Sequence, residues 1–332
     1  MSVAFHGHLS YSAPALQSGF TASTFLELVQ SYPRGHKDVR TRLRPVTALH
    51  LAIKPNRRMT TGIVDGVGAP RLGSSGLAPR AGISDFCVVR VGVPYQAMRL
   101  YEAAVACRLY SAFGGEFDDS TVNLKSRTGG ALDLESDVGG RSLLTWLNEW
   151  GCRQFAKEHH SDAIDRLRTW ARGYLKQLPG ESTDTLDLTD AEIRRAATAY
   201  GVLKEIEASQ RHKRRGPETV SVGPTGAAKI MYALRPNSLP PWDDAIRRHF
   251  EWDGSPDSYA CFLRRVKGEI QELVSDASRC GVTAAAIPGE IRRTASTLPK
   301  IVDEYFWVTI TRKFQVPPLA ELQQWSRWGG AR

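Results

Sequence analysis

The chain has 332 residues, enough to bury the core of one large domain or of two modest ones. Its 44 lysines and arginines exceed its 35 aspartates and glutamates, and the resulting net charge of +9 favours a polyanionic partner. The absence of any run of eighteen apolar residues excludes a membrane-spanning helix, and the N-terminus lacks the basic start and apolar core of a secretory signal. We therefore expect a cytoplasmic protein.

Residues 1–97 contain scattered glycine and proline and show no long helical period. They carry 11 basic and 4 acidic side chains, so most of the excess positive charge lies in this segment. We expect an N-terminal appendage that is partly disordered or extended, followed by a helical domain over residues 98–332.

From Met98 onward the apolar residues recur with a helical period. Helices are predicted over Met98–Phe113, Arg141–Lys157, Ala163–Leu178, Pro256–Ser278, Pro299–Thr311 and Leu319–Trp328. Thr189 and Glu192 form a capping box that starts a further helix, which runs towards Ser209. No convincing strand interrupts this pattern, so the predicted fold class is mainly α.

Late in the chain, the predicted helix Pro299–Thr311 mixes charged and aromatic residues, among them Lys300, Asp303, Glu304 and Tyr305. Charges on a helix are usually solvated. We therefore expect a packed helix whose charged side chains face water.

The segment from Gly223 to Phe250 is the most informative part of the sequence. It begins with Gly223-Pro224-Thr225-Gly226, a combination that predicts a tight hairpin turn. A short apolar helix follows and ends at Pro236. A proline-rich turn then leads to Asp243, which is predicted to cap the next helix.

This order of glycine-rich hairpin, apolar helix, proline-bearing turn and aspartate resembles the helix-hairpin-helix DNA glycosylases. The residues that carry the resemblance are Ser221–Gly226 and Pro241–Ile246. The resemblance implies a helix-hairpin-helix DNA glycosylase-like helical globule that binds double-stranded DNA, with its hairpin and catalytic segment within residues 221–250.

In that family an aspartate at a helix start assists cleavage of the bond between base and sugar, and the resemblance assigns this role to Asp243. A carboxylate stabilises the positive charge that develops on the sugar and can orient the attacking water. Members that also cut the strand use a lysine at the position that Ala228 occupies here, whereas Lys229 is offset by one residue. We therefore predict a glycosylase without lyase activity.

The resemblance also implies DNA contacts for residues that precede Asp243 in the chain. The predicted phosphate-binding residues are Gly223, Thr225, Gly226, Ala227, Lys229, Arg214 and Arg215, the last two from the basic run Arg211–Arg215. A flipped base needs aromatic and polar contacts, for which the candidates are Trp242, Tyr232, Trp150 and Arg153.

No metal or other cofactor is predicted. The five cysteines have wide, irregular spacings that match neither a zinc site nor an iron–sulfur cluster. His159 and His160 are adjacent, so on a helix they would lie about 100° apart.

The leading hypothesis is therefore a monofunctional DNA glycosylase that excises a modified base and leaves an abasic site. The divergence of the motif from the repair enzymes suggests an unusual substrate, such as a hypermodified base in viral DNA, and hence an antiviral role. Two alternatives stay open. Asp243 serves only as a helix cap in a non-catalytic helix-hairpin-helix DNA-binding protein, or the hairpin is accidental in a helical interaction protein.

Overall fold

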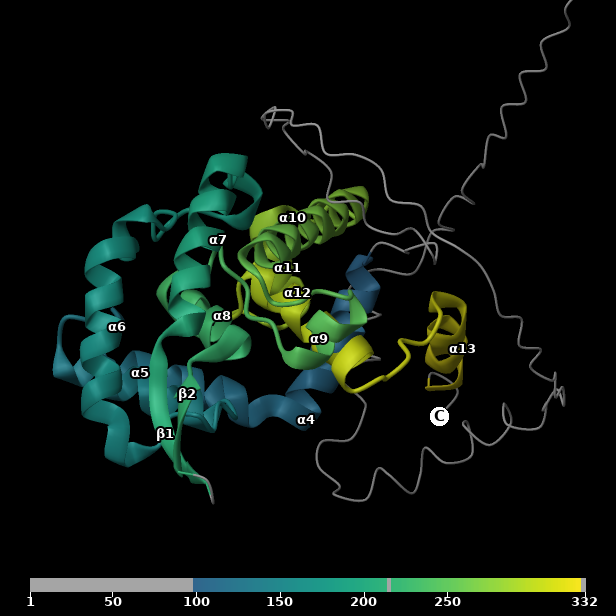
Figure 1. The fold of residues 1–332 in the computed structure, drawn as a ribbon. Helices are drawn as coiled ribbons and strands as arrows, with labels where there is room; N and C mark the ends of the chain where they lie inside the picture. The colour runs from purple at the N-terminus through teal and green to yellow at the C-terminus, as the bar shows by residue number, and fades with distance from the viewer. Residues whose placement is uncertain (1–97, 214–215, 330–332) are drawn as a thin grey trace, which may run out of the picture. The chain divides into compact units, whose positions relative to one another are not determined.

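The computed structural model describes residues 98–213 and 216–329. The predicted appendage, residues 1–97, and the predicted phosphate contacts Arg214 and Arg215 lie outside these ranges. The described part of the chain is mainly helical, which confirms the predicted fold class at that level (Figure 1). The specific fold of a helix-hairpin-helix glycosylase stays a prediction.

Helices make up most of the described chain. They are α4 (Leu100–Arg127), α5 (Asp137–Glu149), α6 (His160–Tyr174), α7 (Asp190–Glu205), α8 (Gly223–Leu234), α9 (Asp244–His249), α10 (Pro256–Arg279), α11 (Ile287–Glu290), α12 (Leu298–Phe306) and α13 (Leu319–Gly329). Single 3-10 turns occur at Lys157–His159, Leu175–Gln177, Thr185–Asp187 and Ala284–Ala286, and α12 continues into a π-helical segment, Trp307–Thr311. Among the described helices, none combines the length and the apolar character needed to cross a bilayer.

Helix α4 is longer than the predicted Met98–Phe113, since it continues to Arg127 through a kink at Gly114. The extension packs on α5, with Leu124 buried and the Trp146 indole Nε1 donating to Thr121 Oγ1 at 3.3 Å. This packing stabilises helix in a stretch whose local sequence does not favour it.

The capping box predicted for α7 is confirmed. The Thr189 hydroxyl accepts a hydrogen bond from the Glu192 backbone N–H, and the Glu192 carboxylate accepts from the Thr189 N–H. The helix ends at Glu205, several residues before the predicted Ser209.

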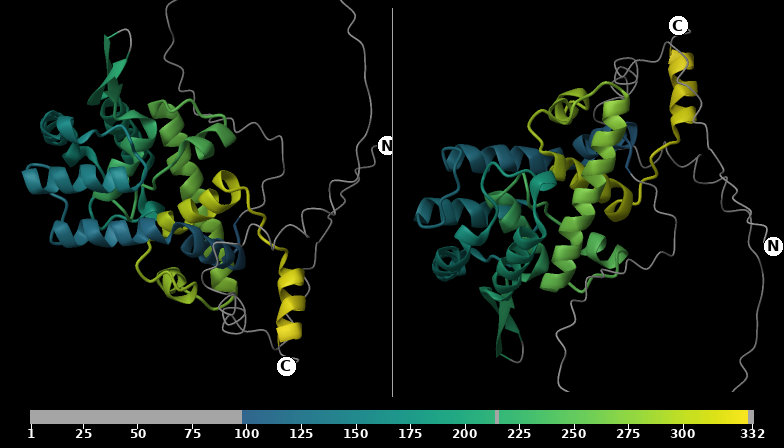
Figure 2. Two further views of the ribbon diagram at one scale, coloured as in Figure 1. Left: turned by 90° about the horizontal axis from the view of Figure 1, so that it is seen from below. Right: turned by 90° about the horizontal axis from the view of Figure 1, so that it is seen from above.

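An antiparallel hairpin follows α7, formed by strands β1 (Glu207–Lys213) and β2 (Gly216–Ser221), so the prediction of an uninterrupted helical body was wrong. Its base is tied to the helices because Ser209 Oγ donates to the Gln154 carbonyl at 2.6 Å and Val222 N donates to the Ile206 carbonyl at 2.7 Å. Both views of Figure 2 show the strands projecting beyond the helices.

Helix α12 occupies a central position, in contact with α4, α10 and α11 (Figure 1). The long helix α10 packs against both α7 and α12, and α8 packs against α5 and α7. This arrangement brings the start of α8, the start of α9 and the end of α12 towards one region of the molecule.

Candidate active site

The predicted glycine hairpin is in fact the first turn of α8. Gly223 has a φ of +69°, a left-handed conformation that favours glycine, and it redirects the chain from β2 into the helix. Gly226 is buried against Gln154, since a Cβ at this position would lie 2.7 Å from the Gln154 Nε2 atom. The turn therefore joins a strand to a helix, whereas the resembled family joins two helices by a hairpin.

This correction reduces the set of amides that can bind a phosphate. The first N–H groups of a helix have no intrahelical acceptor, and no side chain caps α8. The N–H groups of Gly223 and Thr225 lie in this first turn without an intrahelical acceptor, and both residues are partly exposed. Gly226 is buried, and Ala227 is fully buried and falls in the hydrogen-bonded part of the helix, so neither fits the predicted phosphate contact.

Asp243 caps α9, as predicted, with one carboxylate oxygen. Its Oδ1 atom accepts a hydrogen bond from the Ile246 backbone N–H at 2.8 Å. Its Oδ2 atom accepts from the hydroxyl of Thr311, at the end of the π-helical segment, at 2.7 Å. These two donors fix the orientation of the carboxylate. The residue is half-buried, so part of it remains accessible to solvent.

A buried charged cluster lies next to Asp243 and is centred on α12. Lys300 Nζ forms an ion pair with Asp303 Oδ2 at 2.6 Å and a hydrogen bond with the Tyr110 hydroxyl at 3.3 Å. Arg293 pairs with Asp118 at 2.7 Å and with Glu304. We call these residues the α12 charge cluster: Lys300, Asp303, Glu304, Arg293, Asp118 and Tyr110.

The prediction of solvated charges on this helix was wrong, because Lys300 and Glu304 have side chains only 5% and 0% exposed. Burial raises the pKa of the Asp303 carboxyl; the Lys300 ammonium opposes this effect and the negative charge of Asp243 adds to it. The pKa of Glu304 is also raised by burial, against the opposing charges of Lys300 and Arg293. Asp303 thus interacts electrostatically with Asp243.

Trp150 and Tyr232 lie beside this cluster but are packed against each other. Their rings are stacked at a centroid distance of 5.7 Å, and Trp150 also contacts Trp146 at 4.5 Å. The ammonium of Lys300 lies 5.2 Å from the Trp150 ring centroid. Because both predicted pocket residues are only 7% exposed, a base could reach them only after a rearrangement.

Lys229 is directed to the end of α5. Its Nζ atom donates to the Trp150 carbonyl at 2.5 Å and lies 5.4 Å from the Trp150 ring centroid. A lysine ammonium is favourable at a helix C-terminus. This bond replaces the predicted phosphate contact, whereas Arg153, three residues after Trp150, is exposed on the following loop.

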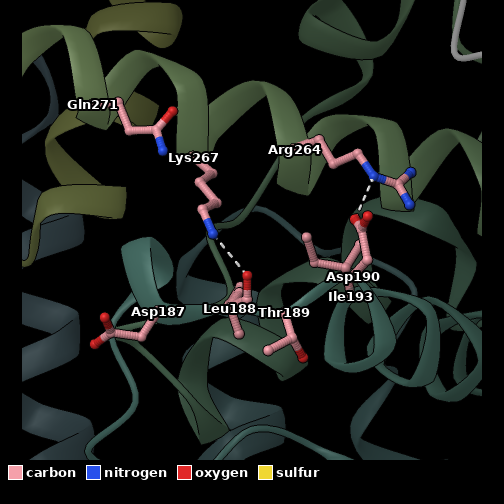
Figure 3. Close-up of a pocket in the computed structure, with 8 residues that line it drawn as sticks. All are labelled: Asp187, Leu188, Thr189, Asp190, Ile193, Arg264, Lys267 and Gln271. Atoms are coloured by element: carbon pink, nitrogen blue, oxygen red, sulfur yellow. Dashed lines mark hydrogen bonds and ion pairs between the residues drawn. The ribbon is translucent and has the colours of Figure 1, made fainter.

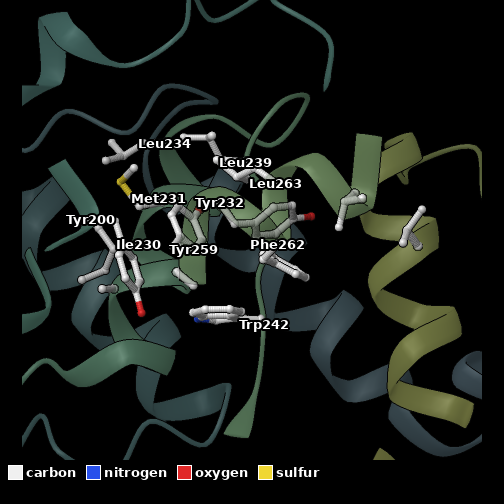
Figure 4. Packing of buried hydrophobic residues seen from close by; sticks show 14 of the residues in the cluster. Tyr200, Ile230, Met231, Tyr232, Leu234, Leu239, Trp242, Tyr259, Phe262 and Leu263 are labelled. Atoms are coloured by element: carbon white, nitrogen blue, oxygen red, sulfur yellow. The ribbon is translucent and has the colours of Figure 1, made fainter. Parts of the chain in front are cut away.

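Trp242 belongs to the core and does not line a pocket (Figure 4). The side chain is 1% exposed and packs against Tyr200, Tyr259 and Phe262, with ring centroids between 4.9 and 5.9 Å away. Its indole Nε1 donates to the Pro224 carbonyl at 3.3 Å. We therefore remove Trp242 from the predicted base pocket, since its function is to join the start of α8 to the start of α9.

A surface pocket elsewhere contains none of the predicted site residues (Figure 3). It lies between α7 and α10, where Lys267 Nζ donates to the Leu188 carbonyl at 2.7 Å and Arg264 pairs with Asp190 at 3.0 Å. These contacts already engage its basic groups, so we do not assign the pocket a function.

The structure therefore brings Asp243 together with Thr311 and Asp303, neither of which the sequence singled out as a site residue. The spacing of Lys300, Asp303 and Glu304 on one helix was the available signal for a cluster. Within the described residues, no group of three or more histidine, cysteine or acidic side chains is arranged to hold a metal ion.

Comparison of the chain with protein-family models, with curated proteins and with solved structures found no match.

Proposed function

We propose that the protein is a monofunctional DNA glycosylase that hydrolyses the bond between a modified base and deoxyribose. The observation that carries this proposal is the geometry of Asp243, a half-buried carboxylate held by Ile246 and Thr311 at the edge of the α12 charge cluster. Two fixed donors orient the carboxylate before substrate arrives, which lowers the reorganisation that charge stabilisation would otherwise require.

In the proposed reaction the bond between C1′ of the sugar and the base nitrogen breaks, and its electron pair leaves with the base. Asp243 stabilises the positive charge that develops on the sugar. Water then attacks C1′ and passes a proton to the carboxylate. The departed base, which took the electron pair, gains a proton, and Asp243 gives up its proton to solvent, so that an abasic site, a free base and the ionised carboxylate remain. Asp303 adds negative charge near Asp243, while Lys300 and Lys229 limit the resulting repulsion.

The phosphate-binding part of the proposal rests on the start of α8. The amides of Gly223 and Thr225 and the positive end of the helix dipole suit a phosphate. Arg247 lies close to this helix start, because a Cβ added to Gly254 would lie 3.0 Å from both an Arg247 nitrogen and the Pro224 ring, but its side chain is only 13% exposed. One Arg247 nitrogen also pairs with Asp244 at 2.9 Å, which holds the guanidinium in place.

A second candidate is a non-catalytic protein that binds double-stranded DNA. It is favoured by the same contacts of Asp243, since both carboxylate oxygens already have partners and a helix cap needs no substrate. In this alternative the start of α8 and the neighbouring basic residues bind the DNA backbone.

The proposed function is tested with duplexes that carry different modified bases, including hypermodified bases of the kind found in viral DNA. We expect one panel member to release free base and to become sensitive to alkali at the abasic site. Strand nicking without alkali, or trapping of a covalent adduct by borohydride, would contradict monofunctional hydrolysis. Salt-sensitive duplex binding without base release from any panel member would favour the second candidate.

A further inference from the structure

The π-helical segment Trp307–Thr311 ends in a turn that carries two exposed positive charges. Arg312 and Lys313 follow Thr311 directly, and both residues are exposed. Among the residues that the structure describes, no acidic side chain forms an ion pair with either cation. We call these two residues the 312–313 turn.

The 312–313 turn lies next to the carboxylate of the proposed reaction. Thr311 Oγ1 donates to Asp243 Oδ2 at 2.7 Å, and the π-helical segment packs on α9, which Asp243 caps (Figure 1). Consecutive Cα atoms are about 3.8 Å apart, so the backbone of Arg312 is one such step from this bond and that of Lys313 two steps. Both cations therefore start from the edge of the region that would hold the sugar.

The backbone of the turn is held on both sides. Arg312 N donates to the Trp307 carbonyl at 2.8 Å, and Phe314 N donates to the Val308 carbonyl at 3.0 Å. The Phe314 ring then stacks on Phe113 of α4, with the ring centroids 5.3 Å apart. The Arg312 guanidinium carbon also lies 5.1 Å from the Trp307 ring centroid, a cation–π contact. The turn is thus in place before DNA binds.

Lys313 occupies a backbone position that favours glycine. Its φ is +56°, the left-handed conformation that glycine commonly adopts just after a helix ends. A cation is favourable at a helix C-terminus, but Arg312 supplies that charge one residue earlier. Residues held in such conformations concentrate at functional sites. The position therefore points to a role for the lysine ammonium itself.

The cations of α9, which follow Asp243 in the chain, are neutralised in part by an acidic neighbour. Arg247 and Arg248 both pair with Asp244, at 2.9 Å and 2.5 Å. The 312–313 turn is different, because its two charges have no such partner in the described part of the chain. It can therefore attract an anion beside the negative charge of Asp243.

We propose that Arg312 and Lys313 bind the two phosphates that flank the nucleotide whose sugar lies over Asp243. This inference rests on the proposed function for its DNA partner and adds the residues that position the reacting strand. Each sugar of a DNA strand is joined to one phosphate on either side, so a sugar held at Asp243 brings both phosphates to the 312–313 turn. A guanidinium binds phosphate through a planar fork and an ammonium binds it as a point charge.

The test measures binding of a fluorescent 20-base-pair duplex that has a tetrahydrofuran abasic-site analogue at its centre. A second duplex carries uncharged methylphosphonates in place of the two phosphates that flank the analogue. A third duplex carries the same two replacements near one end of the strand. Binding is measured at several salt concentrations.

The test variant is Arg312→Gln/Lys313→Gln. The matched control is Arg194→Gln/Arg195→Gln, which removes two exposed positive charges from α7. Arg312→Lys/Lys313→Arg keeps the charge of the turn. Lys313→Gly removes one charge and relieves the left-handed backbone, so weaker binding by this variant cannot result from unfolding. Thermal unfolding checks that all variants are folded.

We expect the unmodified protein, the control and the charge-keeping variant to bind the flank-neutralised duplex more weakly than the other two duplexes, by about tenfold or more. The test variant should lose most of this difference, because its contacts with the flanking phosphates are already absent. Its slope of log affinity against log salt should fall by about 1.8, as for two lost phosphate contacts, and that of Lys313→Gly by about 0.9.

An equal penalty for the flanking replacements in the test variant and in the unmodified protein would overturn the inference. It would also be overturned if the unmodified protein bound none of the duplexes, or if the control lost as much affinity as the test variant.

The outcome is separable from that of the proposed function. Base release by a protein whose test variant keeps the full penalty would leave the glycosylase proposal in place and reject the role of the 312–313 turn. Loss of the penalty in the test variant, without base release from any panel member, would support the turn and reject the hydrolytic reaction.

Discussion

The hydroxyl of Thr311 donates to Asp243 Oδ2 at 2.7 Å, although the two residues are 68 positions apart in the chain. The contact exists because α12 continues into a π-helical segment that ends beside the start of α9. Such π-helical segments occur frequently at functional sites. The bond orients the carboxylate on which the proposed reaction depends.

Thr311→Val should therefore lower the rate of base release by about tenfold or more, since a hydrogen bond to a charged group contributes about 1.5–3 kcal/mol. The measurement is the single-turnover rate on the responsive duplex. Thr311→Ser keeps the hydroxyl and should retain most of the rate. Equal rates for the valine and serine variants would show that Thr311 does not position Asp243.

Trp242 should affect stability more than recognition of a base. Trp242→Ala removes a side chain that is 1% exposed and should lower the free energy of unfolding by about 3–5 kcal/mol. Trp242→Phe keeps most of the volume and should cost less, mainly through the lost bond to the Pro224 carbonyl. Urea unfolding with an unchanged m-value measures both effects. A folded, fully stable alanine variant would contradict the core position.

The contribution of the α12 charge cluster to the stability of the fold should depend on Arg293, which pairs with Asp118 and Glu304. Arg293→Met removes the cation that is hydrogen-bonded to the Glu304 carboxylate, which is 0% exposed, and leaves only the Lys300 ammonium at 4.0 Å, so it should cost about 3–5 kcal/mol. Adding Glu304→Gln should restore part of this loss, because the buried negative charge is then absent. Urea unfolding of the single and double variants checks the coupling. Additive losses in the double variant would mean that the two side chains do not form a pair.

Asp253 should make one contribution to stability that depends on pH. Hydrogen bonds from the Ser258 hydroxyl and the Ser255 N–H lower the pKa of this carboxyl to about 2. Because the pKa in the unfolded chain is about 3.9, the contribution is present above that value and is lost as the pH falls towards 2. Asp253→Asn should therefore lower stability at pH 5, and its difference from the unmodified protein should vanish near pH 2.

The control for that measurement is Asp257→Asn, which changes a charge in the first turn of the same helix and keeps the serine contacts. Chemical unfolding at a series of pH values compares the two variants. The lowered pKa of Asp253 would be contradicted if the free energies of unfolding of Asp253→Asn and of the unmodified protein differed by the same amount from pH 5 to pH 2.

Local signals in the sequence predicted most of the helices and two helix caps, although the bounds of α4, α5 and α7 differ from the prediction. The capping box of α7 and the cap at Asp243 depend on residues within three positions of one another, so they can be recognised without tertiary information. The β1–β2 hairpin was missed because its strands are polar and carry no strong apolar alternation. Its pairing depends on contacts with Gln154, which lies more than 50 residues earlier.

The candidate site was predicted only in part for the same reason. Asp243 follows from the local motif, whereas Thr311 and Asp303 reach it from a helix about 60 residues later. The positions of Trp242 and Lys229 were misjudged because proximity in sequence to Asp243 or to the glycines does not decide whether a side chain faces the core. The burial of Trp242 is set by side chains of α7 and α10, and the bond of Lys229 is set by the packing of α8 against α5.

The measurement that tests the central claim most directly compares Asp243→Asn with Asp243→Ala in base release and in stability. Asparagine caps a helix about as well as aspartate, whereas alanine loses about 1 kcal/mol. The account predicts that Asp243→Asn retains nearly the full free energy of unfolding and duplex affinity but loses base release. Base release at an unchanged rate in a folded Asp243→Asn variant would contradict it and leave Asp243 as a helix cap.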